Sequence, residues 1–478
     1  MALRNRIPDA DAKIPDPVRG VNLVASPEDL EPGEARLMSN CYYWNGVRTR
    51  EGSTRITSSS LGAFRILGGT KYYYAGANSK RLIAYSNKIA VLSDGGAETV
   101  LTTGMTANND TFFQTWSITD KVYVSNGVDK LFEYDGTTWQ SVDSLGGATG
   151  VPNACKKVIP VLDRLFAITT GGLIERTNPR VAHIWSAGSS WATFRPSLVG
   201  PFTAMTPHTL RSSTGDLFPG AIACQANAMY MITGTDYGSD VTAASPPTGE
   251  DAAIKLIDSR IGTSSPNSLV TVPGVGLFGV SSDLNVWFLP FGSASPTIIG
   301  DKLRSTDTAY VTGLESANTA QLSKIWMAYY DRKLILGYPI GSDIYCSRYF
   351  FMDMRAFVEH QDLGPVWNGP HYGFFTNAAW SEDQNGEKSL VAGEGNAATG
   401  AFVYRLLQDG VFTDAVGSSN NNVAFDFQTL YKDFGAASQE KYVQAIQLDM
   451  NNYLGSPTLS LYDLTGRLAA NLPIARII

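Results

Sequence analysis

A local pattern of strand, turn and strand recurs along this chain and restricts the folds that it can adopt. In each copy an Asn or Asp at a turn stands before a basic residue, and an alternating apolar run follows. The four copies centre on Asn87-Lys88, Asp120-Lys121, Asp163-Arg164 and Asp331-Arg332. Asn and Asp suit tight turns, and alternation of apolar residues is typical of a half-buried strand. The pattern predicts an all-β chain of short antiparallel strands.

The spacing of the copies indicates which β architecture to expect. Lys88 and Lys121 are 33 residues apart, and Lys121 and Arg164 are 43 residues apart. Repeats of about 40 residues made of short antiparallel strands are typical of β-propeller blades. We therefore expect a β-propeller, with a β-sandwich or a β-solenoid array as the alternatives.

Composition agrees with a large all-β protein. The chain has 478 residues, of which 44% are hydrophobic, 11% aromatic and only 17% charged, with 46 glycines. Soluble domains usually carry about 25% charged residues. Abundant aromatic and turn-forming residues favour many strands and turns and exclude intrinsic disorder.

The charge of the chain argues against one class of function, tight nucleic-acid binding. The net charge is −7 and no Lys- or Arg-rich run occurs, which argues against tight nucleic-acid binding. Mild acidity is compatible with a surface past which DNA slides without sticking.

Cysteines and histidines suggest no metal or redox site. The cysteines lie at least 69 residues apart and are predicted to be free, buried thiols, and no histidine has zinc-ligand spacing. No nucleophile elbow or phosphate-binding loop occurs. We predict no enzyme activity, no catalytic residues, no metal and no cofactor. The four cysteines are Cys41, Cys155, Cys224 and Cys346, and the four histidines are His183, His208, His360 and His371.

The beginning of the chain contains an arm, a predicted helix and a hairpin. The stretch 1–22 carries several prolines and is expected to be an extended arm without a secretory signal. Pro32 suits the first turn of a helix, and Glu34 suits its positive end. Asn45-Gly46 predicts a two-residue hairpin turn between Cys41–Trp44 and Val47–Arg50. No apolar run approaches the ~20 residues of a membrane helix, so no membrane span is expected.

This order of segments resembles the opening of a family of short-tailed bacteriophage (podovirus) proteins, the β-propeller tail nozzle or tail tubular protein B subunits. The family's serine–proline arm and its proline–glycine–glutamate turn match Ser26-Pro27 and Pro32-Gly33-Glu34, and its Arg-x-Gly strand end matches Arg50-Glu51-Gly52. Two later segments are similar to the same family and occur in the same order. They are Arg180–Ser186 with Trp191 and Phe194, and Arg260–Gly262 with Ser265–Ser268, Val275–Asp283 and Val286–Phe288.

The resemblance implies a division of the chain into four parts. Residues 1–22 form an extended N-terminal arm, and 23–60 form a short helix and hairpin that belong to a small antiparallel β platform module. Residues 61–412 form the β-propeller, and 413–478 form the C-terminal part of the platform. Alternating runs predict platform strands over 423–429, 442–450 and 458–463.

The resemblance also implies a function. The chain is expected to be a structural virion protein in the tail, made in the host cytoplasm, that extends the DNA ejection channel below the portal and adaptor. Its expected partners are further copies in a homohexamer ring, the adaptor or connector ring, the plug or needle protein, and the tail fibre or spike that serves host attachment. Double-stranded DNA is expected to pass through the lumen without sequence-specific binding. As a hypothesis, the acidic residues Asp240, Glu250, Asp251, Glu382, Asp383 and Asp409 line that lumen.

The alternative function is a carbohydrate-binding or glycan-hydrolysing propeller, similar to a lectin or a sialidase. Asp135–Trp139 resembles part of an Asp-box, but Glu133 stands where serine is needed and no residue separates Asp135 from Gly136. Glu382-Asp383 is a candidate pair of glycosidase carboxylates. Trp367–Tyr372 is an aromatic loop that could stack on sugars. The polar stretch 239–253 is expected to be an exposed insertion at a blade edge.

Overall fold

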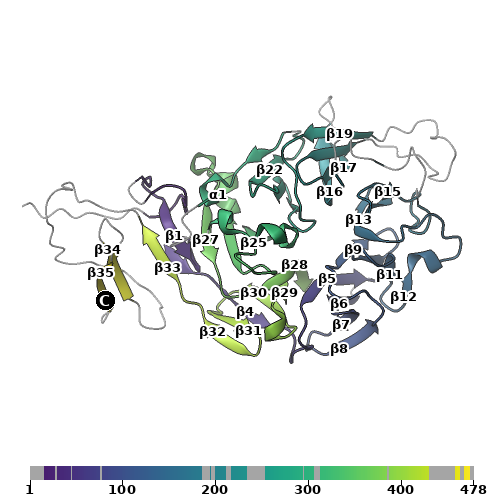
Figure 1. The fold of residues 1–478 in the computed structure, drawn as a ribbon, viewed down its shortest axis with the longest axis horizontal. Helices are drawn as coiled ribbons and strands as arrows, with labels where there is room; N and C mark the ends of the chain where they lie inside the picture. Colours follow the sequence, from purple (N-terminus) through teal and green to yellow (C-terminus); the bar gives the residue numbers. More distant parts are fainter. Residues whose placement is uncertain are drawn as a thin grey trace, which may run out of the picture.

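The chain is a seven-bladed β-propeller in the computed structural model. The structure describes residues 16–26, 29–44, 46–75, 78–185, 194, 200–211, 217–233, 253–293, 295–305, 313–384, 387–429, 458–462 and 468–473. Within them, seven antiparallel sheets of three or four strands are arranged around one axis (Figure 1). The expected propeller is confirmed, and the sandwich and solenoid alternatives are wrong.

Blades follow one another in chain order. The first contains β5 (Ile66–Tyr74), β6 (Asn78–Tyr85), β7 (Lys88–Leu92) and β8 (Glu98–Thr102). The second contains β9 (Phe112–Trp116), β10 (Lys121–Ser125), β11 (Phe132–Tyr134) and β12 (Trp139–Ser141). The third contains β13 (Cys155–Val161), β14 (Arg164–Thr169) and β15 (Ile174–Arg176). The fourth contains β16 (Ala204–Arg211), β17 (Leu217–Cys224), β18 (Met229–Thr233) and β19 (Ala253–Asp258).

The remaining blades continue this order to the end of the propeller. The fifth contains β20 (Val270–Val272), β21 (Gly276–Val280), β22 (Val286–Pro290) and β23 (Thr297–Ile298). The sixth contains β24 (Trp326–Tyr330), β25 (Lys333–Tyr338), β26 (Arg348–Asp353) and β27 (Trp367–His371). The seventh contains β28 (Thr376–Gln384), β29 (Glu387–Glu394), β30 (Val403–Gln408) and, from the beginning of the chain, β4 (Gly52–Arg55).

Helices are short and lie between strands. The α-helix α1 (Met354–Glu359) links β26 to β27. The 3-10 helices are η1 (Val142–Ser144), η2 (Asp301–Leu303), η3 (Leu314–Ser316), η4 (Thr319–Lys324), η5 (Gln361–Leu363) and η6 (Ala397–Thr399). The described residues contain no helix that is long and apolar enough to cross a membrane.

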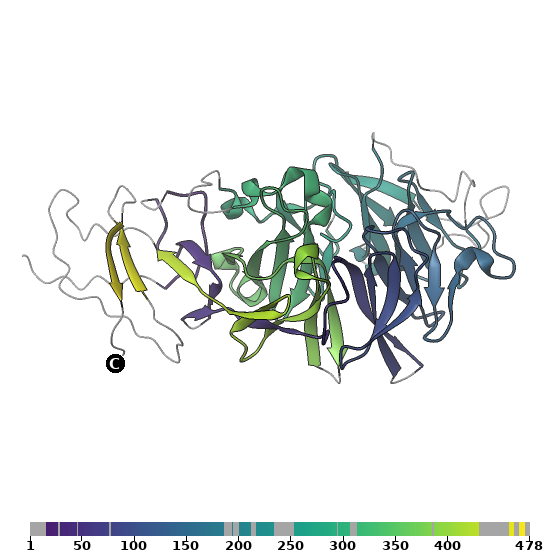
Figure 2. The same ribbon diagram turned by 60° about the horizontal axis from the view of Figure 1, so that its bottom comes forward.

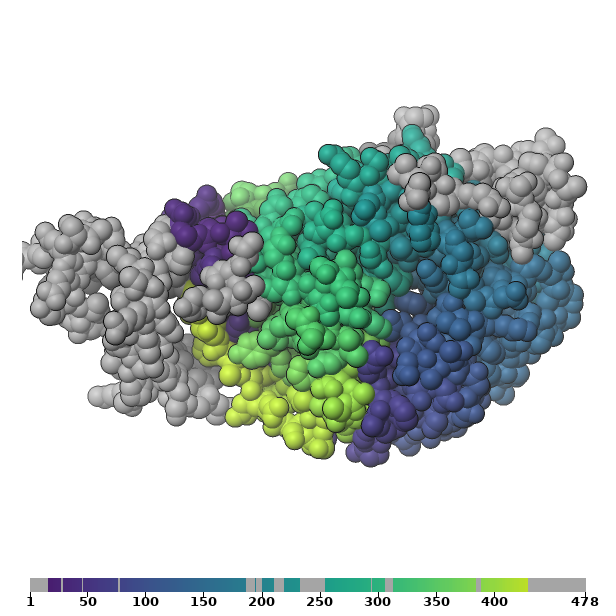
Figure 3. Space-filling view, viewed as in Figure 1, coloured from purple at the N-terminus to yellow at the C-terminus, as the bar shows by residue number. Residues whose placement is uncertain are grey.

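The ring is closed by pairing the two ends of the propeller. β4 runs antiparallel to β30, with Arg55 opposite Tyr404, and thereby supplies the outer strand of the last blade. Figure 3 shows the purple N-terminal residues against the yellow-green residues at this seam. The first strands β28 and β5 of the last and first blades are also in contact. Non-local strand pairing thus holds the first and last blades together.

A second group of strands lies beside the propeller. β1 (Ala35–Ser39) pairs antiparallel with β33 (Asp426–Thr429), and Figure 2 shows these purple and yellow-green strands beside the propeller. β1 also contacts β27 of the sixth blade. The other strands form three hairpins, which are β2 (Cys41–Tyr43) with β3 (Val47–Thr49), β31 (Thr413–Val416) with β32 (Ser419–Asn422), and β34 (Thr458–Tyr462) with β35 (Leu468–Pro473). The hairpin expected around Asn45-Gly46 and the strand expected over 458–463 are therefore confirmed. The stretch 442–450 lies outside the described residues.

The helix expected after Pro32 is wrong. Residues 29–34 form turns that lead directly into β1. Gly33 has a φ of +91°, outside the helical region, and a glutamate carboxylate holds the turn closed. The carboxylate of Glu34 accepts hydrogen bonds from the Glu31 backbone N–H and the Asn22 side chain, both at 3.0 Å. Glu34 therefore closes a turn through one backbone and one side-chain donor and does not lie at the N-terminus of a helix.

The repeated turn pattern combines two different positions in the blades. Lys121, Arg164 and Lys333 begin second strands, at β10, β14 and β25, whereas Lys88 begins a third strand, β7. The spacing from Lys121 to Arg164 is therefore a true blade repeat, and the spacing from Lys88 to Lys121 is not. Turns with Asn or Asp connect the first strand to the second in some blades and the second to the third in another. The pattern therefore identifies hairpins rather than blades.

Candidate functional site

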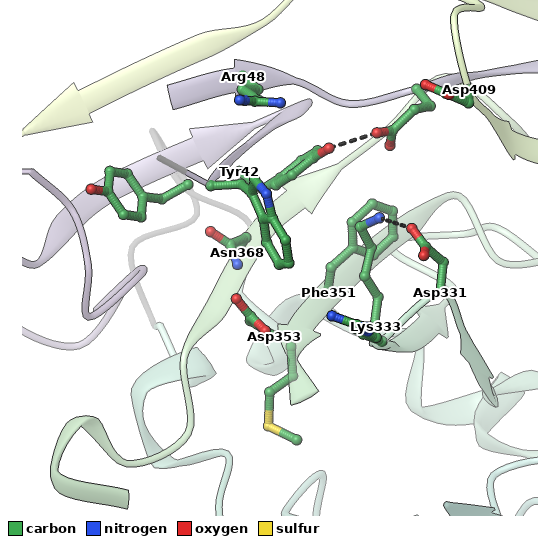
Figure 4. Close-up of a pocket in the computed structure, with 13 residues that line it drawn as sticks. Tyr42, Arg48, Asp331, Lys333, Phe351, Asp353, Asn368 and Asp409 are labelled. Atoms are coloured by element: carbon green, nitrogen blue, oxygen red, sulfur yellow. Dashed lines mark hydrogen bonds and ion pairs between the residues drawn. The ribbon is translucent and has the colours of Figure 1, made fainter. Parts of the chain in front are cut away.

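A cavity of about 370 Å³ lies between the β2–β3 hairpin and the sixth blade. Figure 4 shows Tyr42 and Arg48 of the hairpin on one side, facing Lys333, Phe351 and Asn368 of the blade. The full lining is Tyr42, Tyr43, Trp44, Arg48, Glu51, Asp331, Arg332, Lys333, Phe351, Met352, Asp353, Asn368 and Asp409. Cavities of this size are in the usual range for small-molecule sites. We define this cavity as the hairpin pocket.

The hairpin is fixed over the blade by a buried arginine. Arg50, which follows β3, is fully buried, and its guanidinium forms a bidentate ion pair with Asp414. Its Nε donates to Asn40 Oδ1 at 2.9 Å. A Cβ at Gly373, where φ is +121°, would lie 2.1 Å from the Asp414 carboxylate. Only glycine therefore fits at position 373, beside the Arg50–Asp414 ion pair, which we call the Arg50 clamp.

Contacts inside the pocket order its polar and aromatic side chains. The Tyr42 hydroxyl donates to Glu51 Oε1 at 2.6 Å, and Lys333 Nζ pairs with Asp331 Oδ2 at 2.8 Å while lying 5.2 Å from the Tyr42 ring centre. Burial, together with the negative charge of Glu51, raises the pKa of Tyr42 above its ordinary value. The Tyr42 hydroxyl is therefore a hydrogen-bond donor rather than an anion at neutral pH.

Two buried oxygen atoms at the pocket have no hydrogen-bond partner among the described residues. They are Oδ1 of Asn368, a residue that is 3% exposed, and Oε2 of Glu51. Buried acceptors are normally satisfied, so each indicates a place where a donor can be added. Of the polar side chains that line the pocket, Asp353 is already engaged, because its Oδ1 caps α1 by accepting from Arg355 and Ala356 N–H groups.

The described residues show neither a metal-binding cluster nor an activated thiol. Among the described residues no group of three or more His, Cys, Asp or Glu side chains is placed to hold a metal ion. All four cysteines are free and buried, as expected, and burial raises the pKa of Cys155 and of Cys224 to about 12. Thiols with such pKa values are poor nucleophiles.

Histidines also stand apart from the pocket lining. His208 and His371 are buried, and neither ring nitrogen of either residue has a partner among the described groups. Burial lowers the pKa of His208 to about 4. Burial lowers the pKa of His371 well below its usual range, and the charge of Arg50 lowers it further. Both rings are therefore neutral at pH 7 and are buried inside the protein.

The carboxylates Asp135 and Glu382, which the sequence suggested for glycan chemistry, are engaged in contacts within the protein. Asp135 Oδ1 accepts from the N–H groups of Thr137 and Thr138 at 2.8 and 2.7 Å, and so closes the turn between β11 and β12. Glu382 is 2% exposed and forms a bidentate ion pair with Arg81, with both contacts at 2.7 Å. The interpretation of Glu382 as a lumen or glycosidase carboxylate is wrong, because its charge is neutralised inside the protein.

The expected aromatic loop at 367–372 is wrong for 367–371, although Tyr372, which follows them, is 39% exposed. Residues 367–371 form the fully buried strand β27, where Trp367 Nε1 donates to the carbonyl oxygen of Ile299 at 2.9 Å. Strand pairing to β26 and packing in the core leave no aromatic face for a sugar at Trp367. The stretch 234–252, which contains Asp240, Glu250 and Asp251, lies outside the described residues, as does Trp191.

Sequence reasoning did not find the hairpin pocket. Its walls come from residues 42–51 and from residues beyond 330, so no local motif contains it. The available signals were the aromatic run Tyr42–Trp44 and the charged turn Asp331–Lys333, and neither indicates the other. Only the closure of the ring brings them together.

Comparisons with known proteins add no functional information. No protein-family model matches the chain, and no curated protein matches its sequence. Among solved structures, YCF48 from Cyanidioschyzon merolae is similar at 10% identity with a TM-score of 0.39, covering 75% of this chain and 100% of that one. PorZ, a component of the type-IX secretion system of Porphyromonas gingivalis, is similar at 10% identity with a TM-score of 0.40, covering 88% of this chain and 46% of that one. The fold itself rests on the sheet topology described above.

Proposed function

We propose that this protein is a structural subunit of a tail nozzle ring in a short-tailed bacteriophage. In this role it extends the channel for genome ejection below the portal and adaptor, without catalysis. Its other partners are the plug or needle protein and the tail fibre or spike. Heterologous contacts between copies close a ring of about six subunits.

The observation that carries the proposal is the pairing of β1 with β33 beside the propeller. The resemblance to nozzle subunits implies a platform built from the beginning and the end of the chain, next to a propeller. β1 and β33 come from those two parts, and Met38 lies opposite Phe427 in their register. A two-stranded unit of this kind needs packing against other elements to be stable, and β1 packs on β27. This arrangement supports docking through the platform and DNA passage beside a rigid propeller.

The charge of the channel wall is a separate part of the proposal. Glu382 does not contribute to it, because Arg81 neutralises its charge inside the protein. Asp409 lines the hairpin pocket. The net charge of −7 still supports a surface on which DNA phosphates do not bind tightly.

The oligomeric state of the purified full chain tests the proposal, measured by mass photometry and negative-stain imaging. We expect a closed ring of about six copies, either alone or on the connector proteins encoded beside it. A chain that stays monomeric and does not bind the connector would contradict the proposal. Binding of immobilised glycans by that monomer would favour the lectin alternative.

A matched pair of variants shows whether assembly requires the platform. Phe427 packs against the core cluster that β1 joins, so Phe427→Asp should separate β33 from β1 and reduce ring formation. Val100→Asp introduces the same charge at an exposed residue of β8, on the rim of the first blade, and should leave assembly unchanged. Equal assembly of both variants would argue against a platform role.

A further inference from the structure

We propose that the hairpin pocket binds a neutral carbohydrate, with room for one or two pyranose units. The site includes Asn368 of the segment 367–372 but not the buried Trp367 of that segment, and the proposal does not depend on ring assembly. It rests on the size of the cavity, its aromatic walls, its two unsatisfied acceptors and its balanced charge.

Aromatic side chains give the pocket apolar surfaces of the kind that sugars use. Tyr42, Tyr43 and Trp44 come from the hairpin, while Phe351 of β26 lines the cavity from a buried position, with its ring packed on His371. The C–H faces of a pyranose ring pack on aromatic rings, while its hydroxyl groups need polar partners at the edges. The Arg355 guanidinium lies 3.6 Å from the centre of the Trp44 ring and holds that ring in place.

The two unpaired acceptors favour a ligand that donates hydrogen bonds. Asn368 Oδ1 is buried without a partner in a residue on β27, and Glu51 Oε2 is likewise buried without one. Tyr42 already occupies the other Glu51 oxygen and holds that carboxylate in place. A hydroxyl-rich ligand supplies donors to both oxygens, so binding satisfies groups that are unpaired in the empty cavity.

Charge balance in the lining favours a neutral ligand over an ion. The lining contains four carboxylates and three cations, and Lys333 is already paired with Asp331. A phosphate or carboxylate ligand would meet more negative than positive groups. A divalent cation would meet Arg48 and Arg332, and no metal-binding group of carboxylates occurs among the described residues. Mixed acidic, basic and amide side chains instead suit the alternating donors and acceptors of sugar hydroxyls.

Saturation-transfer NMR on the full chain tests the proposal directly. The probes are the methyl glycosides of glucose, galactose, mannose, N-acetylglucosamine and rhamnose, together with lactose and cellobiose. We expect at least one of them to bind and Trp44→Ala to weaken that binding by about tenfold or more. Asn368→Leu removes the unpaired Oδ1 at nearly the same side-chain size and should weaken binding by about threefold.

Two controls make each result decisive. Phe64→Ala removes an exposed aromatic ring of comparable size outside the pocket lining and should leave sugar binding unchanged. Absence of binding by every probe would overturn the proposal, as would equal binding by wild type and both pocket variants. Displacement of the sugar by inorganic phosphate or calcium would overturn the neutral-ligand assignment. Mass photometry on the same variants separates sugar binding from ring assembly, because loss of one with retention of the other assigns them to different surfaces.

Discussion

Two buried arginines secure the closure of this propeller, and they do so in different ways. Arg50 joins the N-terminal segment to Asp414, which lies beyond the last blade, and Arg81 of β6 joins the first blade to Glu382 of the last. All four side chains are almost completely shielded from solvent. Both pairs connect parts of the chain that are more than 300 residues apart. Each therefore stabilises the ring where the chain itself provides no connection.

The difference between the two pairs lies in what would remain if the arginine were lost. Among the described residues, Asp414 has no charged partner other than Arg50, whereas Glu382 Oε1 also accepts a hydrogen bond from Trp380 Nε1 at 2.9 Å. Arg81 is in turn shared with Asp94, which is 55% exposed. A buried carboxylate with a second donor is less destabilised by loss of its arginine. We therefore expect loss of Arg50 to lower the free energy of unfolding more than loss of Arg81 does.

The largest expected effect is that of Arg50→Ala. Removing the guanidinium leaves Asp414 buried without its counterion, which should lower the free energy of unfolding by about 3–5 kcal/mol. Chemical denaturation followed by tryptophan fluorescence measures this loss. Arg50→Lys should recover only part of it, because an ammonium cannot form the bidentate pair.

A double variant shows whether the loss comes from the unpaired carboxylate. Replacing Arg50 by Met and Asp414 by Leu together removes both charges and should be less destabilising than Arg50→Ala alone. If Arg50→Ala changed the unfolding free energy by less than about 1 kcal/mol, the clamp would be exposed or mispaired and the ranking would fail.

Arg81→Ala is expected to have the second-largest effect. Because Trp380 still donates to Glu382, we expect a loss of about 2–3 kcal/mol in the free energy of unfolding, measured in the same way. Trp380→Phe in the Arg81→Ala background removes the remaining donor and should bring the loss closer to that of Arg50→Ala. A larger effect for Arg81→Ala than for Arg50→Ala would reverse the comparison.

Acid should affect the Arg50 side of the closure through a neighbouring histidine. His371 packs on Phe351 with ring centres 4.1 Å apart, and burial together with the charge of Arg50 holds its pKa well below its usual range. The folded state keeps this ring neutral, while the unfolded chain binds a proton below about pH 6.5. Stability should therefore fall as pH decreases from 6.5, by up to about 1.4 kcal/mol per pH unit.

Comparison of wild type with His371→Leu isolates this contribution. His208, whose pKa burial lowers to about 4, titrates in the same direction in both proteins and cancels in the difference. The variant should lose less stability between pH 6.5 and pH 5 than wild type does. Parallel stability profiles for the two proteins would show that His371 does not link acid to the clamp.

The propeller could be predicted from the sequence because its signals are local. Hairpins with Asn or Asp at the turn and a basic residue after it occur at Lys121, Arg164 and Lys333, and each alternating run became a strand. The blade register was harder to predict, since the turn before Lys88 has the same chemistry at a different strand position. Local turn chemistry identifies strand pairs but not their order in a blade.

The closure and the pocket could not be predicted because their signals are not local. Arg50 belonged to a recognised motif, but nothing near it in the sequence indicated Asp414 as its partner. The acidic pair Glu382-Asp383 suggests lumen or glycosidase carboxylates, and nothing near it in the sequence indicates that Arg81 pairs with Glu382 inside the protein. Pro32 suggested a helix, but the conformation of Gly33 and the bonds to Glu34 produced a turn.

The smallest expected effect provides the baseline for the comparison. Lys130 and Asp143 also form an ion pair, but their side chains are 55% and 33% exposed, so water and salt screen the attraction. Lys130→Ser should change the free energy of unfolding by less than about 0.5 kcal/mol, and that small difference should shrink further in high salt. If Lys130→Ser were as destabilising as Arg81→Ala, burial would not be what distinguishes these pairs. A negligible effect would attribute the strength of the two clamps to the exclusion of water from their charges rather than to ion pairing alone.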